Sequence, residues 1–436
     1  MMKLKFNKKF FFKIHSWIGI KLSILFFIVC FSGTLATLSH EMDWLFIPEM
    51  RASPAHEEVS RNLIVSNIQK TFPLGEIGYW AKSEEAYLCD IVQVRSNDTQ
   101  AYVFVNPYTG EVQGAANLTF RRFFRNLHYF LFVPFQIGHF TVLMFSFLLF
   151  ISLVTALFFY KKWWRKLFVL QTRKGPLVFY RSLHRLVGLW SVPFTLLFSI
   201  TGMWYFVERA NIGNIAAVID FDAPVISEAS ADGNAEKITS YTVDYDRAIA
   251  VAKKEIPTLN VGSISPPNRY SGLIYMRGKS HVPLVRERAN RVYVNPTTYE
   301  VVKVQKAENI NTLTWINDIA DPLHFGTWGG LITKIIWFIV GLGISSLVLS
   351  GIWITLKRKA RLRKNRQTDA LGAWKYLNFI FFGLIMLSMY YQFIWIYHVS
   401  VQNLVGITMG WAVFIGLGYY IFVYRINKLV QSSNDA

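Results

Sequence analysis

The hydrophobic residues of the chain gather in six long apolar segments, which polar stretches of unequal length separate. Each segment reaches the length of about 20 residues that a helix needs to cross the hydrocarbon core of a bilayer. The predicted membrane spans are 14–38, 136–160, 186–207, 331–356, 376–397 and 404–424. The pattern therefore predicts an α-helical integral membrane protein with six spans.

The polar flanks of these spans differ in charge. Residues 1–13, 161–185 and 357–366 are rich in Lys and Arg and contain no Asp or Glu. Because an excess of Lys and Arg marks the cytoplasmic ends of membrane helices, these flanks and both chain ends are predicted to lie inside. The regions 40–134 and 208–330 are then predicted to lie outside. The predicted cytoplasmic parts are the tail 1–13, the loops 161–185 and 357–375, and the tail 425–436.

Composition agrees with a membrane protein and narrows its chemistry. The 436 residues are 53% hydrophobic, and the mean hydropathy is +0.29. A net charge of +19 would indicate nucleic acid for a soluble chain, but here the basic residues flank the spans, so no nucleic-acid partner is predicted. Cys30 and Cys89 are too few for a disulfide framework, an iron–sulfur cluster or a covalently attached haem. The first apolar run is too long for a signal peptide and is interpreted as a retained anchor.

Two of the spans begin and end alike. The segment FKIHSWIGIKLSILFFIVCFSG at 12–33 aligns with RSLHRLVGLWSVPFTLLFSITG at 181–202, at a constant shift of 169 residues. The shift aligns His15 with His184, Gly19 with Gly188, and Gly33 with Gly202. One such histidine alone is more often an interfacial residue. Its repetition favours a functional role, because ionisable groups in membrane spans are costly.

The two outer regions also match each other. Each contains a helix-like stretch, at 59–72 in the first and 245–256 in the second. Each then has two strand-like runs joined by an Asn-Pro turn, in AYVFVNPYTGEVQG at 101–114 and RVYVNPTTYEVVKV at 291–304. A generic hairpin explains either copy alone. Two of them, each before a span, favour a duplicated unit of span, small α+β domain and span.

The second span of each unit has its own histidine, a few residues before the apolar run. These are His128 in NLHYFLF and His324 in PLHFGTWGG. A neutral imidazole is a good ligand for haem iron, and two axial histidines hold a haem without cysteine. His15 and His184 are therefore predicted to bind one haem at the cytoplasmic side. His128 and His324 are predicted to bind another at the outer side, so that electrons could cross the bilayer.

Other residues in these spans have two interpretations each. Gly19 and Gly188 would leave room for a flat macrocycle, and close packing of helices is the alternative. His139 in the second span aligns with Lys334 in the fourth, which favours contact with haem propionates. Snorkelling to the interface is the alternative for this pair, and Lys21 has the same two interpretations.

The remaining histidines fit the pattern less well. His40 lies at the outer end of the first span, but its counterpart in the repeat is Arg209, so it is only a spare ligand. His56, His281 and His398 show no pattern and are predicted to be solvated or satisfied by neighbouring groups.

The sequence contains no motif for binding a nicotinamide or flavin cofactor, from which the chain could accept hydride. No glycine-rich nucleotide motif follows a strand and opens a helix, and the sequence GLG at 341–343 lies within a span. The cytoplasmic segments are too short for a flavin or nicotinamide domain. A quinol, a small reductant or a separate reductase must therefore supply the electrons.

With these motifs the sequence resembles the PepSY-associated transmembrane family. HSWIGI and LHRLVGLW open the first and third spans, and PLHFGTWGG and the twin VNP hairpins also match. The resemblance covers about residues 10–360, so the last two spans lie outside it. The family resembles siderophore–iron reductases of the bacterial inner membrane, which are di-haem proteins with periplasmic PepSY domains. The resemblance implies that the axial ligands are His15, His184, His324 and His128, the last in surroundings (NLHYFLFVPF) that depart from the pattern.

Three functions remain open at this point. The first is an inner-membrane reductase with two b-type haems that acts on periplasmic ferric iron, bound in a siderophore or another chelate. The second is a non-enzymatic membrane protein whose PepSY domains regulate a peptidase or sense the envelope. The third is a metal permease that uses histidines as transient ligands. An absorption spectrum of the purified protein would separate the first from the other two.

Overall fold

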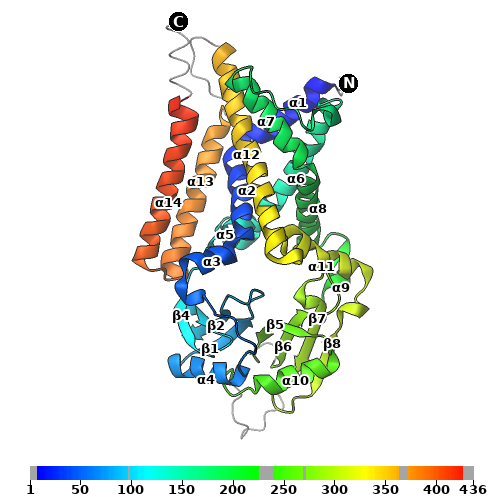
Figure 1. Ribbon diagram of the computed structural model, residues 1–436, viewed down its shortest axis with the longest axis vertical. Helices are drawn as coiled ribbons and strands as arrows, with labels where there is room; N and C mark the ends of the chain where they lie inside the picture. The colour runs from blue at the N-terminus through cyan, green and yellow to red at the C-terminus, as the bar shows by residue number, and fades with distance from the viewer. Residues whose placement is uncertain (1–6, 97–98, 225–238, 269–271, 363–371, 426–436) are drawn as a thin grey trace. The chain divides into compact units, whose positions relative to one another are not determined.

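The computed structural model describes residues 7–96, 99–224, 239–268, 272–362 and 372–425 (Figure 1). The chain divides into two compact units. The membrane unit consists of Met1–Leu38, Arg122–Phe206 and Ile332–Ala436, and the sheet unit consists of Ser39–Arg121 and Val207–Leu331. Parts of the predicted outer regions 40–134 and 208–330, and of the predicted cytoplasmic segments 1–13, 357–375 and 425–436, lie outside the described residues.

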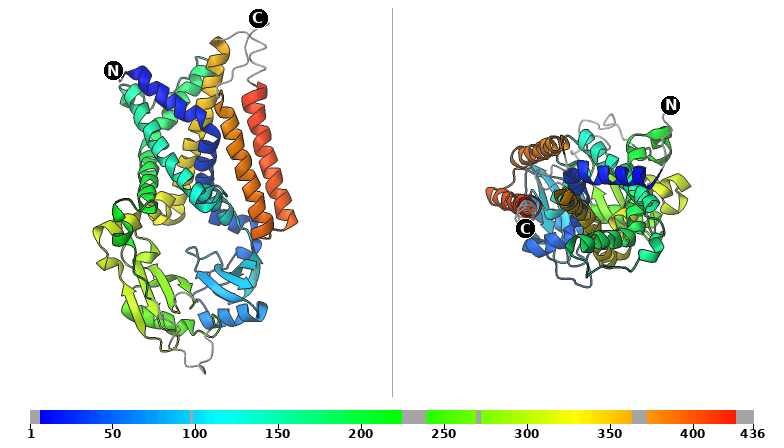
Figure 2. Two further views of the ribbon diagram at one scale, coloured as in Figure 1. Left: turned by 180° about the vertical axis from the view of Figure 1, so that it is seen from behind. Right: turned by 90° about the horizontal axis from the view of Figure 1, so that it is seen from above.

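Four helices are each long and apolar enough to cross a bilayer. They are α6 (Phe135–Phe159), α12 (Gly330–Leu362), α13 (Trp374–Tyr391) and α14 (Val401–Tyr419). The π-helical turns η8 (Gln392–Ile396) and η9 (Tyr420–Tyr424) continue α13 and α14. These two helices lie side by side in both Figure 1 and Figure 2. Among the described residues there are thus four candidate spans, or up to six if each of two bent helix pairs crosses as one.

The first and third predicted spans are broken rather than continuous. Helices α1 (Lys8–Lys21) and α2 (Ser23–Thr37) meet at 75°, and α7 (Pro176–Trp190) and α8 (Val192–Arg209) meet at 60°. Pro193 in the first turn of α8 has no N–H to donate to the preceding turn, which accounts for the end of α7. Hydropathy does not reveal either break, because the segments on both sides are mostly apolar.

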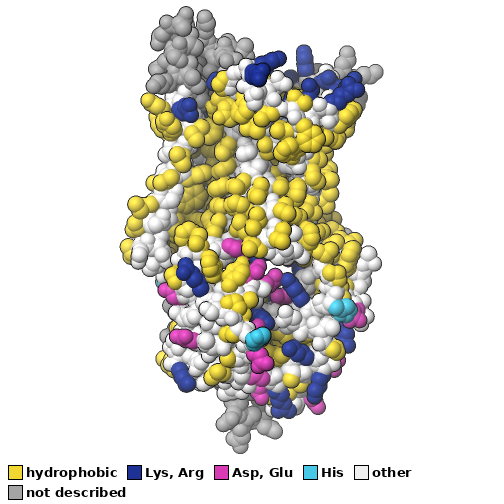
Figure 3. Space-filling model, viewed as in Figure 1, with side chains coloured by type: hydrophobic (Ala, Val, Ile, Leu, Met, Phe, Trp, Pro, Cys, Tyr) yellow, Lys and Arg dark blue, Asp and Glu magenta, His cyan; other side chains and the backbone are white. Residues whose placement is uncertain are grey.

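The surface of the membrane unit suits a lipid environment. Apolar side chains cover its visible face in Figure 3, and Lys and Arg gather at the end where α1 begins. Exposed apolar residues on α13 and α14 include Leu387, Met409 and Val413. A continuous apolar surface of this extent marks contact with a membrane or a partner rather than with water.

The sheet unit is built on one antiparallel sheet of eight strands, in the order β4-β3-β2-β1-β5-β6-β7-β8. The strands are β1 (Glu76–Ala81), β2 (Asp90–Ser96), β3 (Thr99–Val105), β4 (Val112–Ala116), β5 (Asn260–Ser265), β6 (Ile274–Lys279), β7 (Asn290–Val294) and β8 (Val301–Gln305). Helices α4 (Arg61–Thr71) and α10 (Tyr245–Glu255) lie along one side of the sheet (Figure 1). Their buried side chains, such as Ile64 and Ala248, complete the core of the unit.

The helices and hairpins that the sequence predicts in the outer regions are confirmed. Helices α4 and α10 lie within the predicted stretches, and the Asn-Pro pairs connect β3 to β4 and β7 to β8. The side chain of Asn106 accepts hydrogen bonds from the backbone N–H groups two and three residues later, at 2.9 and 3.3 Å. Asn295 repeats this arrangement at 2.8 and 3.2 Å. This capacity to bond its own turn is why Asn favours such positions.

The two predicted outer domains share a single sheet. Strand β1 pairs with β5, which places Trp80 opposite Ile264 and Ala81 opposite Ser263. In a separate four-stranded sheet, β1 or β5 would be an exposed edge with unpaired backbone groups. Their pairing removes both edges. Sequence patterns predict the strands but not which edges will meet.

Shorter helices complete the fold. In the membrane unit these include η2 (Trp163–Lys166), and α5 (Phe120–Phe130) directly precedes α6. Those in the described part of the sheet unit are α3 (Ser39–Phe46), η1 (Pro48–Met50), η3 (Ile212–Asn214), α9 (Ala216–Ile219), η5 (Glu287–Ala289), η6 (Ala307–Asn309), α11 (Thr312–Phe325) and η7 (Thr327–Gly329). The four candidate ligands lie on α1, α5, α7 and α11.

Candidate cofactor site

His15 and His184 lie close together in the membrane unit. His15 is on α1 and His184 is on α7, each in the helix that precedes a break. Their ring centroids are 6.4 Å apart, and the ring planes are nearly perpendicular, at 83°. The structure therefore brings together the two residues that the repeat predicts for the inner site.

Hydrogen bonds hold Nδ1 of both rings. Nδ1 of His15 lies 3.0 Å from the carbonyl oxygen of Ser152 and 3.1 Å from its Oγ. Because a carbonyl can only accept, this Nδ1 carries the proton. Nδ1 of His184 lies 2.8 Å from Oγ of Ser350, which donates its own proton to the carbonyl of Ser346. In both neutral rings Nε2 then keeps a lone pair, which is the state that a metal ligand requires.

The separation of the two rings matches that of two imidazoles that share one haem iron. With a metal–nitrogen bond of about 2 Å and about 1 Å from that nitrogen to the ring centre, two axial imidazoles have centroids roughly 6 Å apart. Among the described residues, every hydrogen bond of the two rings goes to Nδ1, so neither Nε2 is engaged. Ligating histidines usually have their other nitrogen held in this way. In the same part of the chain, no group of three or more His, Cys, Asp or Glu is arranged for a bare metal ion.

A side chain at the first glycine of either repeated span would clash with no described atom. A Cβ added at Gly19 would meet no described atom within 4 Å, and one at Gly188 would approach only Leu347, at 3.8 Å. The last glycine of the third span differs, since a Cβ at Gly202 would lie 2.6 Å from Cβ of Ser146. Close helix packing therefore explains Gly202, whereas room for a macrocycle at Gly19 and Gly188 stays a prediction.

His128 lies on α5 and is held against α2. Its Nδ1 donates to the carbonyl oxygen of Val29, at 2.9 Å. A Cβ added at Gly33 would lie 2.7 Å from Cε1 and 2.8 Å from Nδ1 of the ring. Gly33 therefore leaves the space that the imidazole occupies. The sequence marks Gly33 only as a repeated position and does not predict this contact.

His324 lies near the C-terminal end of α11, where Gly326 ends the helix with a φ of 71°. On the same helix, the buried carboxylate of Asp318 accepts a hydrogen bond from Nε of Arg288 at 2.9 Å, which ties α11 to η5. His324 belongs to the sheet unit and His128 to the membrane unit. Their pairing at one haem therefore stays a prediction.

His139, Lys334 and Lys21 are all parts of the helical framework. His139 on α6 is 5% exposed, stacks on Phe135 and has its Nδ1 3.1 Å from the carbonyl of Tyr129. Lys334 on α12 is also buried, at 6% exposure, and Lys21 is the last residue of α1. Contact of these side chains with haem propionates stays a prediction.

The histidines without a pattern are placed as predicted. His56, His281 and His398 are exposed. His281 also bonds Thr258 at 3.1 Å. His40, the spare ligand, lies on α3 in the sheet unit.

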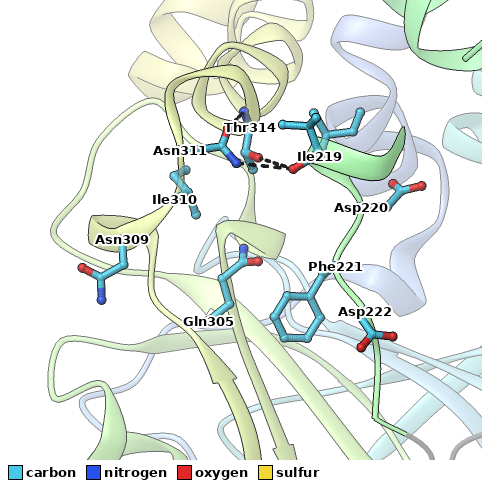
Figure 4. Close-up of a pocket in the computed structure, with 10 residues that line it drawn as sticks. Ile219, Asp220, Phe221, Asp222, Gln305, Asn309, Ile310, Asn311 and Thr314 are labelled. Atoms are coloured by element: carbon cyan, nitrogen blue, oxygen red, sulfur yellow. Dashed lines mark hydrogen bonds between the residues drawn. The ribbon is translucent and has the colours of Figure 1, made fainter. Parts of the chain in front are cut away.

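Two pockets in the sheet unit contain none of the candidate ligands. One, of about 200 Å³, lies between α9, β8 and the start of α11, where Asn311 and Thr314 both donate to the carbonyl of Val218 (Figure 4). The other, of about 290 Å³, is lined by residues 82–86, which follow β1, and by Asn260 and Gly262 of β5. Its charged residues are largely paired, for example Lys279 with Glu84 at 2.9 Å. Among the described residues, no buried side-chain N or O atom that lacks a hydrogen-bond partner lines either pocket.

Sequence reasoning did not identify the serines that orient the inner pair. Ser152 on α6 and Ser350 on α12 are separated from the histidines by more than a hundred residues. A serine in an apolar span is a weak signal, because it can equally bond the preceding turn of its own helix. The contact becomes visible only when the helices are assembled.

Comparison with known proteins gives one match. The sequence model of a protein family, the PepSY-associated TM region, matches residues 12–358. The matched region includes all four candidate ligands and ends before α13. No curated protein matches the chain.

Proposed function

Because the chain belongs to the PepSY-associated transmembrane family, we propose that it is a di-haem oxidoreductase of the bacterial cytoplasmic membrane. It takes electrons from the cytoplasmic side or from the quinol pool and reduces periplasmic ferric iron, bound in a siderophore or another chelate. His15 and His184 hold one b-type haem, and His128 and His324 hold the other.

The His15–His184 pair carries this proposal. Two ionisable side chains from distant parts of the sequence meet inside an apolar helix bundle, with their rings 6.4 Å apart. Polar groups in such a place are costly and are usually functional. Ser152 and Ser350 orient the rings and keep the proton on Nδ1, so both Nε2 atoms remain available. A purely structural pair would gain more from a direct hydrogen bond between the rings.

Haem bound by these residues would supply one-electron chemistry. The ferric ion gains one electron and becomes ferrous, while a quinol or a separate reductase loses that electron. Ferrous iron is softer and less charged than ferric iron, so hard oxygen ligands bind it more weakly. Reduction therefore favours release of iron from the chelate.

The proposal includes six spans, with the sheet unit in the periplasm. The basic flanks of the spans support this orientation. It also includes a duplicated unit of span, domain and span. Two observations support this duplication. The sheet unit contains two copies of a helix followed by four strands, and the copies pair through their equivalent first strands, β1 and β5.

The purified full-length protein tests the proposal. We expect a Soret band, α bands that split on reduction, and two haems per chain by pyridine haemochrome assay. Anaerobic addition of a ferric chelate should oxidise the pre-reduced protein and form ferrous iron. A colourless protein from haem-sufficient cells would overturn the proposal and favour a peptidase-regulating PepSY protein or a metal permease.

A further inference from the structure

Helix α13 carries polar side chains in an otherwise apolar span. It lies beyond the matched region 12–358, and the sequence assigns it no role. Asn378 near its start is 1% exposed, and Ser388 and Gln392 lie near its end. Polar groups in a span need specific partners. The hydrogen-bond partners of these three side chains are backbone groups at the ends of two helices that carry candidate ligands.

Asn378 bridges the break between α1 and α2. Its Nδ2 donates to the carbonyl oxygen of Lys21 at 2.6 Å, and its Oδ1 accepts from the N–H of Ile24 at 3.3 Å. A 75° bend leaves the last carbonyls of α1 and the first N–H groups of α2 without partners in their own helices. One side chain thus satisfies one group on each side of the bend. Lys21 follows His15 by six residues on the same helix.

Ser388 and Gln392 act at the break between α5 and α6. Both donate to the carbonyl oxygen of Phe132, Ser388 through its Oγ at 2.6 Å. Leu131 and Phe132 have left-handed φ values of 56° and 55°, which are unfavourable for residues with a side chain. Such a turn persists only where its surroundings hold it. Phe132 follows His128 by four residues.

A second connection joins the end of α13 to α5 itself. The hydroxyl of Tyr397 donates to Oε1 of Gln392 at 3.0 Å and accepts from Nδ2 of Asn126 at 3.2 Å. Asn126 is buried and precedes His128 by two residues. Gln392 begins the π-helical turn η8, a form of helix that often occurs at functional sites. Gln392 therefore bonds directly to the backbone that follows α5. It is also connected to the last turns of α5 through the hydroxyl of Tyr397.

We propose that α13 is a positioning helix for both candidate haem sites. Asn378 fixes the end of α1 and thereby the ring of His15. Ser388 and Gln392 fix the end of α5 and thereby the ring of His128. The inference rests on the proposed function, because it assigns a role relative to the haem ligands. No water can replace the hydrogen bond to Lys21, which lies within the first predicted span, and the strained turn at Phe132 would lose the bonds that hold it. Removing these side chains should therefore release both helix ends.

A simple packing role for α13 makes a different prediction. The helix also packs through aromatic rings, such as Trp374 on Trp17 at 5.3 Å and Phe393 on Phe132 at 5.1 Å. If packing were its only role, polar variants would change both haem sites alike or neither. A positioning role requires that each variant change only the site beside its own break.

Variants of the full-length protein separate these roles. In haem-loaded protein, Asn378→Leu should shift the midpoint potential and the low-spin paramagnetic resonance signal of one haem only. Ser388→Ala combined with Gln392→Leu should shift those of the other haem only. Tyr390→Phe is the matched control, because this hydroxyl on α13 bonds Thr408 of α14 at 2.6 Å. It should leave both haems unchanged.

Hydrogen exchange provides a measurement that needs no haem. Asn378→Leu should accelerate amide exchange in residues 20–26 but not in 128–134, and the double variant should do the reverse. Unchanged exchange in both segments, or equal acceleration by both variants, would overturn the positioning role. If Asn378→Leu does not fold, Asn378→Asp replaces it, since it keeps the acceptor but loses the donor to Lys21.

The same experiments distinguish this inference from the proposed function. Wild-type protein without haem would overturn the proposed function, whatever the exchange data show. If the wild-type protein binds two haems and neither set of substitutions changes the haem spectra, only the positioning role would be overturned. Ser388→Thr, which keeps the hydroxyl, should retain wild-type exchange in residues 128–134 and thus report on the hydrogen bond itself.

Discussion

The imidazole of His128 occupies the space that a side chain at Gly33 would fill. A Cβ at Gly33 would lie 2.7 Å from Cε1 of His128, a distance that real Cβ atoms essentially never show. The ring cannot retreat freely, because its Nδ1 bonds the carbonyl of Val29, one helical turn earlier on α2. The closing glycine of the first span is therefore part of the environment of a candidate ligand.

Gly33→Ala should displace His128 and weaken binding of the haem proposed for this residue. The new methyl group forces the ring away from Val29 or forces α2 and α5 apart, and overpacking of this kind costs about 1–3 kcal/mol. We expect haem content to fall from two towards one per chain, with the remaining spectrum that of the inner site. Haem content and optical spectra of the purified variant measure this effect.

Gly406→Ala is the control for this substitution. Gly406 is also in a span, on α14, but a Cβ there would meet no described atom within 4 Å. It should bind two haems. If Gly33→Ala also binds two haems with wild-type spectra, His128 is not a ligand in the position that the structure shows.

Loss of either inner histidine should remove one haem. His15→Ala and His184→Ala each delete one of the two proposed axial ligands, so both should reduce haem content by about half and abolish reduction from the cytoplasmic side. His398→Ala, in an exposed turn of the same unit, should retain both haems. Full haem content in both inner variants would show that the repeated histidines are structural.

Ser350→Ala should weaken the inner site without destroying it. The hydroxyl of Ser350 orients His184 through a 2.8 Å hydrogen bond, and loss of such an outer partner typically lowers metal affinity about 10- to 100-fold. Titration of apoprotein with haem would measure the change. Ser346→Ala, which changes a serine one turn away, should bind haem as wild type because its backbone carbonyl still accepts from Ser350.

Much of the fold follows from local patterns in the sequence. Apolar length predicts α6, α12, α13 and α14, and turn chemistry predicts the hairpins at Asn106 and Asn295. The breaks at Leu22 and Ser191 do not follow from apolar length, because each apolar run continues beyond the break. The continuous sheet does not follow either, since strand patterns carry no information about which edges pair.

For the candidate site too, the sequence predicts some features and not others. The repeat in the sequence predicts that His15 and His184 belong together, and the structure places their rings 6.4 Å apart. It does not predict Ser152, Ser350 or Asn378, whose roles arise from contacts between helices far apart in the chain. Serine and asparagine also bond their own helices, so their presence in a span is not distinctive.

Stability of the sheet unit should depend on pH through Asp43. This residue on α3 is 1% exposed, and its carboxylate accepts from the N–H groups of Phe120 and Arg121 at 2.6 and 3.3 Å. Burial raises the pKa of Asp43 to about 7, against the opposing effects of these bonds and of the Arg121 charge. Because the folded state binds the proton more tightly than the unfolded state, the stabilisation is complete below about pH 4 and is lost as pH rises through about 7.

Asp43→Asn should remove this dependence, because Asn does not titrate. Between about pH 4 and 7, unfolding free energy should fall with a slope steeper by about 1 kcal/mol per pH unit in wild type than in the variant. Thermal or denaturant unfolding in detergent measures the two slopes. Asp222→Asn, at a fully exposed side chain, is the control and should keep the wild-type slope. Parallel profiles for wild type and Asp43→Asn would contradict the raised pKa.

His324→Ala should separate electron entry from electron exit. The proposed outer haem loses one ligand in this variant, while His15 and His184 are unchanged. We expect the inner haem to remain reducible from the cytoplasmic side. Ferric chelate should then fail to reoxidise it, because a bulky hydrophilic chelate cannot enter the hydrocarbon core to reach the inner site.

Anaerobic oxidation of the pre-reduced protein, followed at the α band, measures this block. His128→Ala should behave like His324→Ala if the two residues share one haem, and His281→Ala, at an exposed histidine of the sheet unit, should react as wild type. Different haem contents in the two variants would separate His128 from His324 and point to another partner for one of them. Oxidation of His324→Ala at the wild-type rate with one haem missing would mean that electrons leave by a route that does not pass the outer site. That result would still leave the inner pair intact, because its ligands come from α1 and α7 alone.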